Sequence, residues 1–441
     1  MKNKKILIIT YYWPPCGGGG VQRWLKFVKY LPSFGWNTFV AVPKNPEYPV
    51  IDNTLLADVP RDAEIIRLPI WEPYNIFKKL TGRKKDEKVN SGILFDDSPR
   101  SLMEKISLWI RGNFLIPDPR LFWVRPSIRR LKKHIKIINP SVIITTGPPH
   151  SVHLIGKGLK KEFPDIFWLA DFRDPWSEFD LLDNFYPSKL ARARQRTLEK
   201  RVLDSADVVI TVSPTWVKNL QKFTSTPVKF LANGYDHKDF TTSFETIPNK
   251  FIITYTGILN TYRNPLPFWK ALEEVCLENT DFNNDLNVKI FGISDNGLRN
   301  ILSEFPNILN KTKLCGYVSH IEIIKHYNES SCLLLLLNNT KNSMGHIPGK
   351  FFEYLAANRP ILAIGPNDSD AAGIIKELES GIICAFDDKE NIKNALIEIY
   401  QKWKLNSTYE ILDVGEFSRA KLTEKLVELI DNIIIQDGEK N

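Results

Sequence analysis

The chain has 441 residues, of which 43% are hydrophobic and 25% are charged, and its formal net charge is +8. This length and composition are typical of a globular protein with two or three domains, and they exclude a collagen-like or low-complexity chain. The net charge is moderate for the length, so it does not by itself indicate nucleic-acid binding, and we expect no nucleic-acid partner.

The five cysteines form no CxxC pair and show no metal-ligand spacing. A sparse, odd set of cysteines predicts a reducing compartment and no metal site. The apolar stretch Ile6–Thr10 is too short for a signal peptide, and Leu333–Leu337 is far below the ~20 residues needed to span a bilayer. We therefore expect a cytoplasmic protein, either free or peripheral at the inner face of the membrane.

Short apolar runs typical of buried parallel strands alternate with amphipathic stretches typical of helices. In the first half, the predicted strands are Lys5–Thr10, Thr38–Val42, Val142–Thr146, Phe167–Asp171, Val208–Val212 and Val228–Leu231. Predicted helices include Gln22–Leu31, His150–Lys161 and Pro187–Leu203. This alternation predicts an α/β domain with a parallel sheet.

Residues 71–130 interrupt this alternation and are rich in Trp, Pro, Lys and Arg. We interpret them as an insertion in the N-terminal domain, with a helix near Ser101–Arg111. One face of that helix carries the apolar residues Leu102, Ile106, Trp109 and Ile110. This face either packs on the domain, which we favour, or contacts a membrane or a lipid acceptor.

A second set of strands follows. The predicted strands are Lys250–Tyr255, Asn287–Phe291, Lys313–Cys315, Ser331–Leu337, Pro360–Ile364 and Gly381–Ala385, with a helix over Pro265–Glu278. Two tandem Rossmann-like α/β domains are therefore expected, with the boundary in the polar stretch Tyr235–Asn249 after an Asn-Gly turn signal. We divide the chain into residues 1–240, 241–415 and a final helical segment, 416–441.

The first predicted strand leads into the glycine-rich segment Gly17–Gly20, and a helix follows. Glycines let the backbone approach a ligand closely, and a helix N-terminus favours negative charge. The segment matches neither GxGxxG nor a Walker A loop. We predict a flexible ligand-contact loop in which Gly18 and Gly19 contact the donor, with a tight turn as the alternative.

Three catalytic candidates follow strands of the first half. His150 begins a helix, where it either handles a proton and binds sugar hydroxyls or serves in capping and packing. Asp171 and Asp174 flank an arginine, and they either orient acceptor hydroxyls or form a structural ion cluster. Sequence spacing does not establish the carboxylate separation that glycoside hydrolysis requires.

In the second half, Gly257 and Arg263 link a strand to a helix. A guanidinium beside a helix N-terminus suits a diphosphate, with a surface salt bridge as the alternative.

The most informative segment is Ile347–Ala363, in which Lys350 and Glu353 lie in the early turns of a helix that Asn358 can end. Lys350 suits phosphate oxygens. Glu353 can accept hydrogen bonds from the vicinal hydroxyls of a ribose, with helix-dipole stabilisation as the alternative.

This arrangement resembles the GT-B glycosyltransferases, specifically glycosyltransferase family 4, over nearly the whole chain. The segments that carry the resemblance are Gly17–Gly20, Asp171–Trp176, Asn233–Asp236, Thr256-Gly257 with Arg263, and Pro348–Pro360. It implies two Rossmann-like domains facing a cleft, of which the N-terminal one binds the acceptor and the C-terminal one binds the nucleotide sugar. It also implies that the final helix, around Glu416–Ile434, returns to the N-terminal domain.

The resemblance further implies that Glu353 holds the ribose and that Arg263 and Lys350 neutralise the diphosphate. The family's usual signature has two glutamates with seven residues between them, but the position that pairs with Glu353 is occupied by Gly345. Family members also often carry a basic residue after the glycine that matches Gly257, where this chain has isoleucine. His346, beside the vacant position, is a candidate for the missing donor contact.

The implied reaction transfers a sugar from a nucleoside-diphosphate sugar to a hydroxyl of a glycan or lipid-linked acceptor, with retention and without a metal or other cofactor. The implied setting is the synthesis of a cell-surface polysaccharide or glycolipid. Two alternatives stay open. One is a nucleotide-sugar epimerase or a hydrolase on the same fold. The other is a non-catalytic sugar-nucleotide-binding component of a polysaccharide assembly complex.

Overall fold

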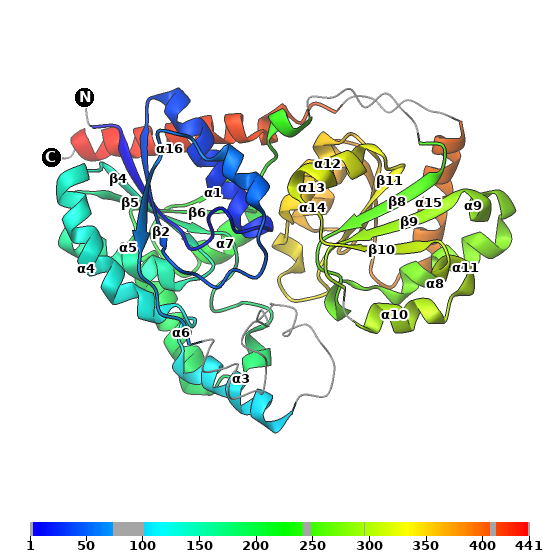
Figure 1. Ribbon diagram of the computed structural model, residues 1–441, viewed down its shortest axis with the longest axis horizontal. Helices are drawn as coiled ribbons and strands as arrows, with labels where there is room; N and C mark the ends of the chain where they lie inside the picture. Colours follow the sequence, from blue (N-terminus) through cyan, green and yellow to red (C-terminus); the bar gives the residue numbers. More distant parts are fainter. Residues whose placement is uncertain (1–2, 74–100, 241–247, 295, 406–411, 440–441) are drawn as a thin grey trace. The chain divides into compact units, whose positions relative to one another are not determined.

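The computed structural model (Figure 1) describes residues 3–73, 101–240, 248–294, 296–405 and 412–439. The chain forms two compact units. The first consists of Met1–Asn90, Pro99–Ala232 and Arg419–Asn441, and the second contains Asn233–Ser418. Parts of the predicted insertion and of the predicted boundary, residues 74–100 and 241–247, lie outside the described residues.

The described part of the first unit contains a seven-stranded parallel sheet in the order β3-β2-β1-β4-β5-β6-β7. Its strands are β1 (Lys5–Ile9), β2 (Asn37–Pro43), β3 (Glu64–Leu68), β4 (Val142–Gly147), β5 (Phe167–Phe172), β6 (Val208–Thr211) and β7 (Val228–Phe230). The central strands are buried along their length, as expected for a parallel sheet with helices on both faces. Of these strands, only β3 was not predicted from the sequence. It is an edge strand that is half exposed.

The helices in the described part of this unit are α1 (Gly19–Tyr30), α3 (Leu102–Phe114), α4 (Leu121–Ile138), α5 (Ser151–Glu162), α6 (Lys189–Leu203), α7 (Pro214–Gln221) and α16 (Arg419–Glu439). The last helix, α16, packs against α1 and therefore belongs to the first unit (Figure 1). The strand order reverses between β1 and β4, so ligand-binding loops are expected where α1 and α5 begin.

The described part of the second unit contains a six-stranded parallel sheet in the order β10-β9-β8-β11-β12-β13. Its strands are β8 (Phe251–Thr256), β9 (Leu286–Phe291), β10 (Thr312–Gly316), β11 (Cys332–Leu336), β12 (Ile361–Ile364) and β13 (Gly381–Cys384). Its helices are α8 (Leu266–Glu278), α9 (Thr280–Asp285), α10 (Asn296–Ser303), α11 (Pro306–Leu309), α12 (His320–Asn328), α13 (Gly349–Ala356), α14 (Asp370–Glu377) and α15 (Lys389–Lys404). The predicted α/β class with two Rossmann-like units is confirmed, and here the order reverses between β8 and β11.

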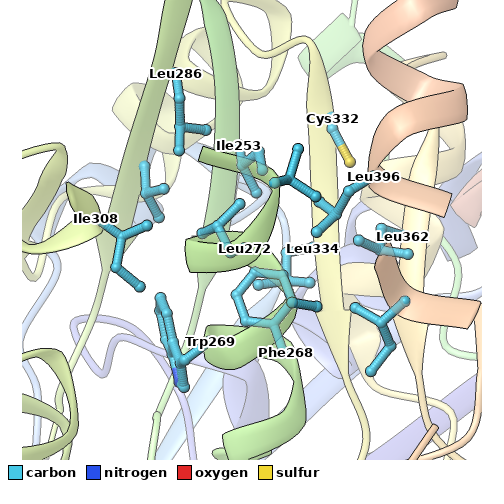
Figure 2. Close-up of a cluster of buried hydrophobic side chains, with 14 of the residues drawn as sticks. Ile253, Phe268, Trp269, Leu272, Leu286, Ile308, Cys332, Leu334, Leu362 and Leu396 are labelled. Carbon is cyan, nitrogen blue, oxygen red and sulfur yellow. The ribbon is translucent and has the colours of Figure 1, made fainter. Parts of the chain in front are cut away.

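The apolar core of the second unit fixes α8 against the sheet. Figure 2 shows Phe268 and Leu272 of this helix beside Leu334 of β11 and Ile253 of β8, and these residues and Trp269 are all buried. Leu272 lies three positions after Trp269 and four after Phe268, which places the three side chains on one face of the helix. This packing holds the loop between β8 and α8, where the first half of the candidate site lies.

One prediction about the insertion is wrong. Helix α3 packs through Ser107, Leu108 and Gly112, where a side chain at Gly112 would lie 2.2 Å from the Phe185 carbonyl oxygen. The close approach at this glycine turns the opposite face outward. The face that we expected to pack on the domain is therefore exposed; it comprises Leu102, Ile106, Trp109 and Ile110.

None of the helices within the described residues has the length and apolar composition of a membrane span.

The core packing leads to a stability prediction. Replacing Leu272 with alanine leaves a cavity beside Trp269, so we expect the free energy of unfolding to fall by about 2–5 kcal/mol. Urea unfolding followed by tryptophan fluorescence measures this loss. The control, Leu277→Ala, removes a side chain on the same helix that is 68% exposed, and its effect should stay within about 0.5 kcal/mol. Equal losses in the two variants would contradict this account of the core.

Candidate functional site

The carboxyl ends of β8 and β9 meet through two glycines. Gly257 adopts φ 117° and Gly292 adopts φ 114°, a region that side chains rarely adopt. A side chain at Gly292 would lie 2.2 Å from the Gly257 carbonyl oxygen. The loop after β8 therefore packs closely against the end of β9. Other side chains occupy the space beside the start of α13.

Lys350 reaches into this space from the first turn of α13. Its Nζ donates to the Thr256 carbonyl oxygen and lies 3.8 Å from the centre of the Tyr255 ring. Burial, followed by the positive charge of Arg263, holds the pKa of Lys350 well below its usual value, although Glu353 acts in the opposite direction. An anion placed at this ammonium would restore its charged form.

Arg263 ends the short 3-10 helix η6 (Thr261–Arg263), just before α8, and its Nε donates to the Asn338 side-chain oxygen beyond β11. His346 follows the 3-10 helix η7 (Ser343–Gly345). Burial, with Arg263 and Lys350 as further causes, lowers the pKa of His346 to about 3. Its imidazole is therefore neutral at pH 7, and it lies within the electrostatic influence of Arg263 and Lys350.

Glu353 lies one turn after Lys350 on the same helix. Its Oε1 lies 3.0 Å from His320 Nε2, and its Oε2 accepts a hydrogen bond of 3.2 Å from the Tyr327 hydroxyl. The helix ends where Asn358 adopts a left-handed conformation with φ 51°, as the sequence predicts. The second unit thus brings Gly257, Arg263, His346, Lys350 and Glu353 to one edge of its sheet.

The sequence analysis missed three members of this site. Tyr327 and Tyr354 both place their hydroxyls within 3.1 Å of the Thr256 hydroxyl, and His320 contacts Glu353. A signal for His320 was present: it begins a helix directly after strand β10, behind a Ser319–Glu322 capping box. The carboxyl ends of parallel strands meet at one edge, so this position belongs beside Glu353.

The glycine-rich loop of the first unit is shorter than predicted. Gly17 and Gly18 precede α1, whereas Gly19 and Gly20 form its first turn. Gly18, with φ 85°, and Gly19 are both exposed, and a side chain at either would meet nothing within 4 Å. Space for a ligand is therefore present at both.

Arg173 ties this turn to the loop after β4. Its Nη1 donates to the Gly20 carbonyl oxygen at 2.6 Å, and its Nη2 donates to the Pro148 carbonyl oxygen at 2.7 Å. The Nε donates to the Gly147 carbonyl oxygen at 3.1 Å. One guanidinium thus fixes two loops at the switch point of the first sheet.

Asp171 is fully buried. Its carboxylate accepts two hydrogen bonds of 3.2 Å from Arg23, one of 2.6 Å from the Trp24 indole and one of 2.9 Å from the Thr146 hydroxyl. These contacts agree with the alternative in which Asp171 belongs to a structural ion cluster. Its carboxylate joins α1 to β4 and β5. Asp174 is half-buried.

His150 is the N-cap residue of α5, and Asp118 supplies the capping bonds by accepting from the Ser151 backbone at 2.8 Å. The His150 ring stacks on Trp176, with 5.1 Å between ring centres. Burial, then His153 and Arg173, holds the pKa of His150 well below its usual value, so the ring is neutral at pH 7.

A model of the family described as Glycosyl transferases group 1 matches residues 238–432, which span most of the second unit and the start of α16. Sucrose-phosphate synthase from Thermosynechococcus elongatus has a similar structure, with a TM-score of 0.62 and 14% identity, covering 99% of this chain and 98% of that chain. The chain therefore contains a glycosyl transferases group 1 domain and has the GT-B fold, which together support a glycosyltransferase. The same findings support sugar transfer from a nucleotide sugar.

Two further solved structures resemble the glycosyltransferase. A TarM variant of S. aureus in complex with fondaparinux, alpha-GlcNAc-glycerol and UDP gives a TM-score of 0.58 at 10% identity, covering 98% of this chain and 100% of that chain. WaaG, a glycosyltransferase involved in lipopolysaccharide biosynthesis, gives 0.56 at 12% identity, covering 96% and 99%. At these identities the structures show the shared fold. A search of curated proteins found no match.

The Asp171 cluster gives the second prediction. Asp171→Asn leaves Arg23 buried without its countercharge, so we expect a loss of about 3–5 kcal/mol in the free energy of unfolding. Asp183→Asn is the matched control, because its arginine partner, Arg192, is 43% exposed and the pair should contribute at most about 1 kcal/mol. Denaturant titration of both variants measures the difference. Equal stability of Asp171→Asn and the wild type would argue against a structural role.

Proposed function

We propose that the glycosyltransferase binds a nucleoside-diphosphate sugar at the edge of the second sheet formed by Gly257, Arg263, Lys350 and Glu353. The observation that carries this proposal is the half-buried Lys350, whose Nζ contacts the Thr256 carbonyl oxygen and the Tyr255 ring and whose pKa is lowered by burial and by Arg263. A diphosphate would supply the missing negative charge. Glu353, three residues further along the helix, would accept hydrogen bonds from the ribose hydroxyls.

Catalysis then depends on stabilising the leaving diphosphate. Cationic groups fixed in a site of low polarity stabilise developing negative charge without reorganising, which makes them more effective than water. Lys350 and Arg263 would provide this charge, and we propose that transfer requires no metal or other cofactor. The resemblance to family 4 supports retention of the anomeric configuration.

The donor sugar would contact His346. Gly345 provides no carboxylate at the position where the family usually has its first glutamate. His346 follows it, and its neutral imidazole can both donate and accept a hydrogen bond with a sugar hydroxyl. Gly18 and Gly19, the donor-contact residues predicted in the first unit, are exposed, so their backbone amides are open to a ligand.

The acceptor, a glycan or a lipid-linked sugar of cell-surface polysaccharide or glycolipid synthesis, would bind to the first unit near His150. The Nδ1 atom of His150 is buried and has no hydrogen-bond partner within the described part of the chain. An acceptor hydroxyl would satisfy it, and a neutral imidazole can accept the proton of that hydroxyl. Asp174 is half-buried and is the carboxylate of its pair that a ligand can reach.

The third prediction tests the nucleotide site. Glu353→Ala removes a charged hydrogen-bond acceptor, so nucleoside diphosphates should bind roughly 10–100-fold more weakly, equivalent to about 1.5–3 kcal/mol. Calorimetry with UDP, GDP and ADP, in the presence of EDTA, measures the affinity and tests the absence of a metal requirement. Glu377→Ala, an exposed acidic residue of α14, is the control. Unchanged binding and turnover in Glu353→Ala would reject the assignment.

Product analysis separates the remaining alternatives. A transferase forms a glycosylated acceptor only when both substrates are present. An epimerase converts the nucleotide sugar without an acceptor, and a non-catalytic component binds the nucleotide but releases no product.

We also propose that the first unit contacts an anionic membrane through α3. Its outer face exposes Leu102 by 74%, Trp109 by 45% and Phe114 by 63%. Lys105 and Arg111 lie on the same helix. Exposed apolar residues with basic neighbours are typical of helices that lie in a membrane interface.

Helix α4 adds positive charge and contains no acidic residue; its basic residues are Arg125, Arg129, Arg130, Lys132, Lys133 and Lys136. In its first turn, the exposed Phe122 packs edge-on against the exposed Trp71, with 4.8 Å between ring centres. Such a surface complements anionic lipid headgroups, and each basic residue near the membrane contributes about 1 kcal/mol.

The fourth prediction tests this contact. The wild type should co-sediment with vesicles that contain anionic phosphatidylglycerol, and binding should fall with added salt. Replacing Trp109 and Phe114 with serine should abolish most of it. Leu277→Ser, a change at an exposed residue of the second unit, is the control. Absence of wild-type binding to these vesicles would refute the membrane proposal.

A further inference from the structure

We infer that His320 is a positioning residue that orients the Glu353 carboxylate for ribose binding. This inference rests on the proposed role of Glu353, and it adds the residue that orients the Glu353 carboxylate. It starts from the contact of 3.0 Å between His320 Nε2 and Glu353 Oε1. Both side chains are largely shielded, with 15% and 18% of their surfaces exposed.

The contact fixes which ring nitrogen carries a proton. An ionised carboxylate only accepts hydrogen bonds, so His320 must donate from Nε2 to Glu353. On the other side of the ring, Nδ1 lies 3.9 Å from Asp239 Oδ2, which belongs to the 3-10 helix η5 (His237–Phe240). This distance is too long for a hydrogen bond, so Asp239 acts on the imidazole through its charge.

A second donor from the same helix holds the other oxygen of Glu353. The Tyr327 hydroxyl donates to Oε2 at 3.2 Å, and burial followed by the Glu353 charge keeps the pKa of Tyr327 well above its usual value. His320 and Tyr327 are seven residues apart, so they lie on the same face of α12. The helix therefore presents two protons to the two carboxylate oxygens.

Two donors at fixed positions define the plane of the carboxylate. A carboxylate has about four acceptor positions, so it can hold both donors and still accept hydrogen bonds from ribose hydroxyls. Without His320, the Glu353 side chain regains rotational freedom, which binding must then remove. Loss of a partner behind a binding group typically weakens binding about 10-fold or more.

The effect should appear in substrate affinity more than in turnover. The ribose does not change during sugar transfer, so Glu353 contacts it equally in the ground state and in the transition state. Losing such uniform binding raises KM and leaves kcat nearly unchanged. A residue that only supported the fold would instead lower the apparent kcat through loss of active protein and leave KM unchanged.

The experiment compares ligands that differ in one hydroxyl. UDP, GDP and ADP are each measured against the corresponding 2′-deoxy nucleotide, in the wild type and in Glu353→Ala, His320→Ala and His320→Gln. In the wild type the 2′-hydroxyl should improve binding roughly 10-fold, as expected for a hydrogen bond to a charged group. In Glu353→Ala this ratio should fall to about one, as the contact is gone.

His320→Ala should reduce the ratio and weaken nucleotide binding about 10-fold. His320→Gln should restore much of both, because its amide can donate to Glu353. The matched control is His326→Gln, at a histidine of the same helix that pairs with Glu329 at 3.0 Å and not with Glu353. Its ratio should equal that of the wild type. Thermal unfolding of each variant identifies any that fail to fold, and His320→Gln decides the outcome if His320→Ala is among them.

The possible failures are distinct. If Glu353→Ala abolishes the 2′-hydroxyl ratio while His320→Ala and His320→Gln keep the wild-type ratio and affinity, the positioning role of His320 is overturned and the nucleotide site stands. If Glu353→Ala also keeps the wild-type ratio, the ribose role of Glu353 fails, and this inference fails with it. Absence of wild-type binding to all three nucleotides would overturn both.

Discussion

The central strands of both sheets are buried on both faces, and this constraint determines where polar chemistry can occur. Such strands pair through their backbones and fill most of their side-chain positions with apolar residues, as in β11. The charged and polar side chains of the two sites then gather at the last residues of the strands and in the loops and helix starts at the carboxyl edge. The residues of the second-unit site all lie at that edge: Gly257 follows β8, His320 follows β10, and Lys350 and Glu353 begin the helix between β11 and β12.

The two units treat buried charge in opposite ways at this edge. In the first unit, Arg23 and Asp171 neutralise each other through two hydrogen bonds of 3.2 Å, and the pair stiffens the frame around the loops. In the second unit, Lys350 is half-buried beside Arg263 and contacts a carbonyl oxygen and an aromatic ring. Balanced charge suits a frame, whereas an excess of positive charge suits the binding of an anion. The family match over residues 238–432 supports sugar transfer from a nucleotide sugar, and these residues include Lys350 and Arg263.

Helix α3 shows how a correct local prediction can lead to a wrong conclusion. Its apolar residues do share one face, as the helical period requires, but the helix packs on the unit through the opposite face. Ser107 and Gly112 add no hydrophobic signal to the sequence, so the apolar periodicity alone assigned the buried face to the wrong side of the helix. The decisive feature was the close approach of Gly112 to the Phe185 backbone, a contact between residues from different segments. Strand β3 was missed for a related reason, because an edge strand that is half exposed carries only part of the apolar signal.

The sequence by itself determined the alternation of strands and helices, the two Rossmann-like units and the helix that carries Lys350 and Glu353. These features depend on local periodicity, turn residues and capping, all of which operate over a few neighbouring positions. Only the tertiary structure decided which groups surround those side chains. His320 and Glu353 are 33 residues apart, and Arg23 and Asp171 are separated by 148. Such pairs form because the sheet order brings distant strand ends together, and neither burial nor the resulting pKa shifts can be read before that order is known.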